Sequence, residues 1–132
     1  MTRTRPCPPE VRRGRMKKAE QFLDAATLIR DLADEDGEVA DAYVTLCVHA
    51  GIATADVICC ARLGQHAQGE NHNEAAELLG KADRDSVAPL RTLLGMKTRA
   101  GYGYTPAAAA ECKRAGRAAE SLIEAARRAA NS

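Results

Sequence analysis

Two long stretches of this sequence repeat apolar residues at alternating steps of four and three. This near-heptad spacing puts one apolar seam along one side of a helix. Long helices bury such seams when they pack side by side at small crossing angles. The two stretches therefore predict long, nearly antiparallel helices. The seam positions are Val39, Tyr43, Leu46, Ala50, Ala53, Val57 and Cys60 in the first stretch, and Ala108, Cys112, Ala115, Ala119, Leu122, Ala126 and Ala129 in the second.

The rest of the chain also favours helices. Aromatic residues make up only 3% of the sequence and Trp is absent, which favours helices over sheets. A chain of 132 residues has the size of one domain and can bury a core. We expect an all-α, up-and-down bundle of four main helices and one short helix, over residues 10–33, 38–63, 72–81, 87–96 and 106–130.

Local signals mark several helix ends. Asn71 and Glu74 have the spacing of a capping box and predict the start of the short helix. Pro89 fits a helix only in its first turn. Thr105 followed by Pro106 predicts the start of the last helix, with Thr105 as its cap.

The charge distribution divides the chain. Residues 1–18 carry seven basic side chains and one acidic one, whereas the remainder carries 12 basic and 17 acidic side chains. Residues 1–9 hold three prolines and no apolar periodicity, so we expect a disordered basic arm there and a single domain over 10–132. Basic arms bind nucleic acid or acidic partners, or they are solvated tails.

The cysteines predict a reduced protein. There are five, an odd number, and none has the C-x-x-C spacing. Cys47 and Cys60 fall on apolar helical stripes, where a free cysteine behaves as a small hydrophobic residue. Because disulfides are rare in the cytosol, we expect a cytoplasmic protein. The His and Cys residues do not cluster at ligand spacings, so no metal is expected.

Other function classes lack their signals. The sequence has no Gly-rich phosphate loop and no nucleotide fingerprint, so no cofactor is expected. No apolar run reaches the roughly 18 residues of a membrane span. No apolar segment follows the basic N-terminus, as a secretory signal would require.

Residues 96–106 differ in character from the rest of the chain. They combine two cations, two glycines and two of the three tyrosines, where one helix ends and the next begins. Cations hold phosphate and tyrosines stack on bases, a combination that suits single-stranded RNA. The candidate residues for binding RNA or a partner protein are Lys97, Thr98, Arg99, Tyr102 and Tyr104.

The spacing of this segment resembles the motif of the HEPN superfamily, whose members are small α-helical bundles and include many RNA-cleaving toxins. In its RNases an Arg and a polar residue are followed, a few residues on, by a His and often a Tyr. The matching positions here are Lys97, Thr98, Tyr102 and Tyr104. Lys replaces Arg and Tyr replaces His, and an unperturbed phenol stays protonated at neutral pH. The resemblance therefore implies a HEPN-like bundle without the catalytic pair.

The resemblance also implies a setting. In this superfamily the motif commonly lines a cleft between two subunits, so a homodimer is expected. Toxin–antitoxin and phage-defence systems are the family context. The small residues from Ala50 to Ala55 could contact either a neighbouring helix or the second subunit. We expect a non-catalytic module that binds RNA or a partner protein.

Two other functions are open. Arg62, His66 and His72 supply a cation and two imidazoles within eleven residues. They would suit a metal-independent RNase, in which His serves as general base and general acid and Arg steadies the phosphorane. His49 and Asp56, about two turns apart, have no catalytic spacing. A helical bundle that binds a nucleotide or another small ligand is the second alternative.

Overall fold

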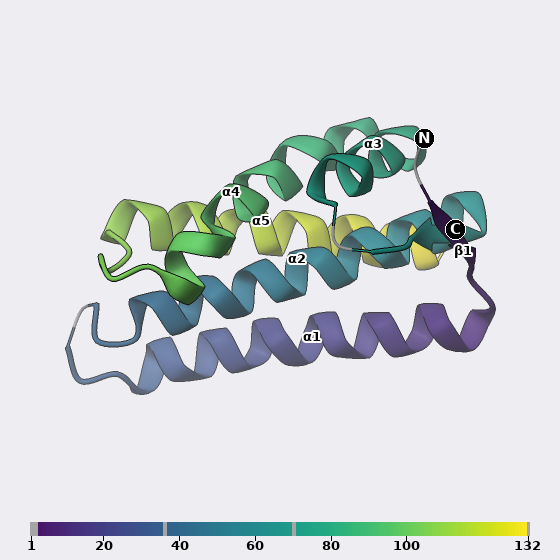
Figure 1. Cartoon of the computed structure of the whole chain (residues 1–132). Helices are drawn as coiled ribbons and strands as arrows, with labels where there is room; N and C mark the ends of the chain where they lie inside the picture. The colour runs from purple at the N-terminus through teal and green to yellow at the C-terminus, as the bar shows by residue number, and fades with distance from the viewer. Residues whose placement is uncertain (1–2, 36, 70, 132) are drawn as a thin grey trace.

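The computed structural model describes residues 3–35, 37–69 and 71–131. The bundle of four main helices and one short helix is confirmed (Figure 1). The helices are α1 (Pro9–Leu32), α2 (Ala40–Leu63), α3 (His72–Ala82), α4 (Val87–Tyr102) and α5 (Ala109–Ala130). A 3₁₀ turn, η1 (Arg84–Ser86), precedes α4, and two short strands are present, β1 (Thr4–Pro6) and β2 (Gln65–Ala67).

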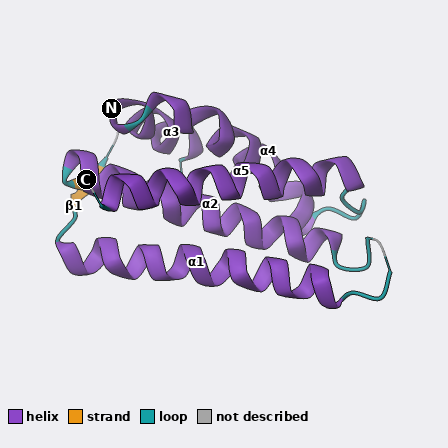
Figure 2. Cartoon of the chain, turned by 180° about the vertical axis from the view of Figure 1, so that it is seen from behind, coloured by secondary structure: helices purple, strands orange, loops and turns teal. Residues whose placement is uncertain are grey.

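Helix α2 is the centre of the bundle. It packs against α1, α4 and α5 and also contacts α3 (Figures 1 and 2). Its Val44 and Ile58 are fully buried, together with Leu93 of α4 and Leu122 of α5. By length and composition alone α2 could cross a membrane, but most of its apolar stretch is covered by the other helices. Its apolar character is therefore accounted for by the core.

The small residues of α2 are used inside the chain. Ala53 packs with Ala19 of α1 and Ile123 of α5. A Cβ on Gly51 would overlap the Leu93 side chain and press against Leu122. The Ala50–Ala55 patch therefore lets neighbouring helices approach closely, which was the first of the two contacts that the sequence left open.

The expectation of a disordered basic arm at residues 1–9 is wrong for residues 3–9. Strand β1 pairs with β2 in antiparallel register, with Arg5 opposite His66. Cys7 and Cys60 form a disulfide, so the expectation of a reduced protein, with Cys60 as a free thiol, is also wrong. The partners of β1 lie about sixty residues away in the sequence, where no local pattern could reveal them. Residues 1 and 2 lie outside the described residues.

Two predicted helix ends need correction, and two local signals are confirmed. Helix α4 continues past Met96 to Tyr102, so most of the candidate segment is helical. Helix α5 begins at Ala109 and not at Pro106. Asp41 of α2 accepts a hydrogen bond from the Ala107 amide at 2.9 Å, which holds the segment before α5 extended. The predicted cap is present, because the Asn71 side chain accepts from the Glu74 amide at 3.1 Å, and Pro89 lies in the first turn of α4.

Candidate anion-binding site

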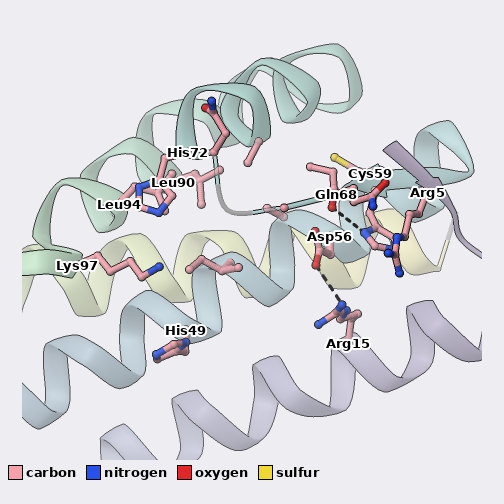
Figure 3. A pocket seen from close by; sticks show the side chains of 17 residues that line it. Arg5, Arg15, His49, Asp56, Cys59, Gln68, His72, Leu90, Leu94 and Lys97 are labelled. Atoms are coloured by element: carbon pink, nitrogen blue, oxygen red, sulfur yellow. Dashed lines mark hydrogen bonds and ion pairs between the residues drawn. The ribbon is translucent and has the colours of Figure 1, made fainter. Parts of the chain in front are cut away.

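A pocket of about 420 Å³ opens between α2, α4 and the segment from β2 to the start of α3 (Figure 3). Pockets that hold small molecules have volumes of about 300–1,000 Å³. Ile52, Leu90 and Leu94 give it apolar walls. Its ionisable lining residues, apart from the thiol of Cys59, are Arg5, Arg15, His49, Asp56, His66, His72 and Lys97.

The lining is electropositive. It contains three permanent cations, all three histidines of the sequence and, among the described residues, a single carboxylate. Partial enclosure by protein strengthens the attraction between such cations and an anion, because the effective dielectric constant is lower than in water. The chemistry of the pocket therefore favours a phosphate or carboxylate ligand.

One end of the pocket is built by β1, β2, α1 and α2. Arg15 of α1 forms an ion pair with Asp56 of α2, with 3.5 Å between Nε and Oδ2. The Asp56 side chain is only 18% exposed. Burial raises the pKa of Asp56, and the charges of Arg15 and His66 oppose that rise. The β1–β2 pairing sets Arg5 beside His66 at this end.

The buried His66 has a defined tautomer. Its Nδ1 lies 2.9 Å from the carbonyl oxygen of Ala67. A carbonyl oxygen only accepts hydrogen bonds, so Nδ1 carries the proton and donates it. The Nε2 atom of neutral His66 is consequently the basic nitrogen. It is available to accept a hydrogen bond or to take up a proton.

The other end of the pocket is formed by α3 and α4. Figure 3 shows His72 beside Leu90 and Leu94, and Lys97 extending from α4 on the same side. His49 of α2 lies below them, and its ring packs against Phe22 of α1 with 5.5 Å between ring centroids. Cations therefore lie at both ends of the pocket, Arg5 and Arg15 at one and Lys97 at the other.

The structure divides the group predicted in residues 96–106. Lys97 lines the pocket. Thr98 and Arg99 are exposed on α4, and Arg99 forms an ion pair with Glu111 of α5. Tyr102 and Tyr104 are 85% and 99% exposed and do not line the pocket. The two tyrosines are therefore separate from the site to which Lys97 belongs.

The structure brings together only part of the group of residues predicted for a metal-independent RNase. His66 and His72 line the same pocket, whereas Arg62, in the last turn of α2, does not. Sequence reasoning missed Arg5, Arg15 and the role of Asp56. The basic character of residues 1–18 was the one signal that pointed to these arginines.

Further basic side chains surround the β1 end of the molecule. Strand β1, the start of α1 and the end of α5 lie there, while the α1–α2 connection lies at the opposite end (Figures 1 and 2). The exposed basic residues of these elements are Arg3, Arg13, Lys17, Lys18, Arg127 and Arg128, of which Arg127 forms an ion pair with Glu20, and the exposed acidic residues Glu10 and Glu124 lie on the same helices. The opposite end exposes the acidic residues Asp31, Asp34, Glu35 and Glu38, of which Asp31 forms an ion pair with the exposed Arg30. The surface beside the pocket therefore extends its positive charge.

The pocket lacks the features of a thiol or metal centre. Cys59 lines it, but burial raises the pKa of this thiol to about 12, so it is protonated at neutral pH and unreactive. Within residues 3–35, 37–69 and 71–131, no three His, Cys, Asp or Glu side chains converge to hold a metal ion.

The fold and the site define an all-α helical bundle with a partly enclosed cationic pocket. Comparison with known proteins finds no family model that matches this chain and no match among curated proteins.

Proposed function

We propose that this protein is a non-catalytic binding module that holds single-stranded RNA by a phosphate group in the cationic pocket. The observation that carries the proposal is the convergence of Arg5, Arg15 and Lys97 with three histidines around a cavity with one described carboxylate. An unpaired nucleotide can enter such a pocket, where Leu90 and Leu94 would contact its base or sugar. A duplex keeps its bases stacked inside the helix.

The basic end of the molecule supports the same proposal. A strand that leaves the pocket on the β1 side would pass the exposed cations of β1, α1 and α5. Each phosphate that such a cation neutralises releases counterions, which gives affinity that depends steeply on salt. The acidic α1–α2 connection would keep the strand from the opposite end.

The proposal retains the HEPN-like character implied by the sequence. The positions that match the catalytic pair hold Lys97 and Tyr102, and Tyr102 is 85% exposed and lies outside the pocket. A phenol in water is a poor general base at neutral pH. Homodimerisation and a toxin–antitoxin or phage-defence setting belong to this proposal as implications of the resemblance.

Fluorescence anisotropy with a labelled single-stranded uridine oligonucleotide tests the proposal. Lys97→Ala and Arg15→Ala should each weaken binding about tenfold, because each removes a charged contact to phosphate. Each should also lower the slope of log K against log salt by about 0.7. Lys113→Ala is the matched control, since Lys113 is exposed on α5 outside this pocket.

Three results would change the assignment. Equal losses for Lys97→Ala and Lys113→Ala would place binding outside the pocket. Competition by a free mononucleotide as strong as that of the oligonucleotide would indicate a small-ligand site. Absence of RNA binding would leave a partner protein as the ligand and overturn the RNA proposal.

The structure favours one second candidate, a metal-independent RNase. His66 and His72 share the pocket, and the tautomer of His66 leaves its Nε2 free to act as a base. The test is incubation of RNA with the purified protein in chelator. His66→Asn retains a donor for the Ala67 carbonyl and removes the base. Cleavage that disappears in this variant would establish the RNase, and intact RNA would exclude it.

A further inference from the structure

Strand β1 brings Arg5 to the pocket through few contacts. The Cys7 amide donates to the Gly64 carbonyl at 3.0 Å, and the Gln68 amide donates to the Arg3 carbonyl at 2.8 Å. The hydroxyl of Thr4 donates to the side-chain oxygen of Gln65 at 2.8 Å. Besides these contacts and the antiparallel pairing of Arg5 with His66, the disulfide between Cys7 and Cys60 ties the strand to the last turn of α2.

The pairing of β1 with β2 is weak without the disulfide. Both strands have only three residues, and an isolated two-stranded ribbon is marginally stable in water. Pro6 has no amide hydrogen to donate, and Pro8 follows Cys7 directly. The disulfide is therefore the covalent link to α2 that reinforces this short pairing and keeps Arg5 opposite His66.

We propose that the redox state of the Cys7–Cys60 pair regulates ligand binding, because only the disulfide form holds Arg5 in place at the pocket, opposite His66 of β2. The inference rests on the proposed function, since the ligand it regulates is the RNA phosphate. The disulfide form binds, and the dithiol form loses the Arg5 contact.

The chemistry is a thiol–disulfide exchange with a dithiol reductant. A reductant thiolate attacks the half-buried sulfur of Cys7 and forms a mixed disulfide, while Cys60 leaves and takes up a proton. The second thiol of the reductant then displaces Cys7, which also becomes protonated. The protein disulfide gains two electrons and two protons, and the reductant becomes a disulfide.

Release of the strand leaves the bundle intact. Helix α1 begins at Pro9, two residues after Cys7, and packs along α2. Reduction therefore frees only the segment before α1. The other cations of the pocket, Arg15 and Lys97, stay on packed helices.

The binding experiment compares oxidised and dithiothreitol-reduced protein with the same labelled uridine oligonucleotide. Reduction should weaken the binding of the oligonucleotide to the wild-type protein about tenfold, as expected for the loss of one charged contact. Arg5→Ala should bind like reduced wild type in both states. Cys7→Ser should also bind weakly in both. Lys113→Ala is the matched control, because this exposed α5 cation does not line the pocket and should leave the response to reduction unchanged.

Hydrogen exchange provides a readout that does not need RNA. Reduction should speed exchange of the Cys7 and Gln68 amides and leave the buried Val57 amide of α2 protected. Unchanged exchange, or equal RNA affinity in the two states, would overturn the regulation while leaving the RNA proposal standing. RNA binding by neither state, with faster exchange on reduction, would instead overturn the RNA proposal and with it the regulation.

Discussion

Asp56 is the one carboxylate among the described residues of the pocket, and it works against the binding of an anion. Its burial also disfavours the ionised carboxylate, and for this reason the pKa of Asp56 is raised above the usual 3.8. A carboxyl whose folded pKa exceeds its unfolded pKa binds protons more tightly in the native state. The resulting stabilisation is complete below the unfolded value and is lost as the pH rises through the folded value.

We therefore expect Asp56→Asn to raise both stability at neutral pH and affinity for RNA. Thermal unfolding from about pH 3 to pH 7 should show a smaller loss of stability with rising pH than in the wild type. Binding should strengthen because Arg15 is freed and repulsion of phosphate ends. Asp24→Asn, on the exposed side of α1, changes the net charge equally and should affect neither property. Weaker binding by Asp56→Asn would show that the carboxylate positions Arg15 for the ligand.

Helix packing in this bundle depends on close approach at Gly51. This glycine of α2 faces Leu93 of α4 and Leu122 of α5, which are both fully buried. Neither leucine has free space into which to move, because core side chains are close-packed. The glycine thus fixes the separation of the central helix from two of its neighbours.

Gly51→Ala should lower the free energy of unfolding by about 1–3 kcal/mol, because overpacking outweighs the better helix propensity of Ala. Gly95→Ala is the control, since Gly95 lies on α4 with no other group within 4 Å of an added Cβ. That change should stabilise the protein by up to about 1 kcal/mol. Urea denaturation measures both, and a stabilised Gly51→Ala variant would mean that α4 shifts at little cost.

Basic side chains predominate at the β1 end of the molecule, and most of the small-residue face of α2 is internal. A second subunit could reach Gly51 and Ala53 only if the helices of the bundle separated, whereas Ile52 of the same patch lines the pocket. Homodimerisation implied by the HEPN resemblance stays a prediction, and it must use another surface. Sedimentation of the wild-type chain at micromolar concentration tests it.

Ala53→Glu tests the packing of the bundle. Ala53 is 6% exposed between α1 and α5, so a glutamate there would bury an unpaired charge. We expect a loss of about 3–5 kcal/mol of stability at every protein concentration. A folded variant that differs from the wild type only in its sedimentation would show that the patch is an intersubunit contact.

The sequence by itself determined the helices. Their signals are local, because apolar spacing defines the buried side of a helix and capping acts within one turn. The Asn71–Glu74 contact and the place of Pro89 were predicted for this reason. The start of α5 was not predicted correctly, because the carboxylate of Asp41, which accepts the hydrogen bond from the Ala107 amide, belongs to another helix.

Only the tertiary structure decided the candidate site. Arg5 meets His66, and Cys7 meets Cys60, across more than fifty residues of intervening chain. Such pairs depend on how the α1–α2 hairpin closes, which no local periodicity records. The rotation of α4 in the bundle likewise turns Lys97 toward the pocket, while Tyr102, near it in sequence, lies at the helix end in solvent. The packing of the helices thus determines which of the polar residues that are close in sequence lie in the same site.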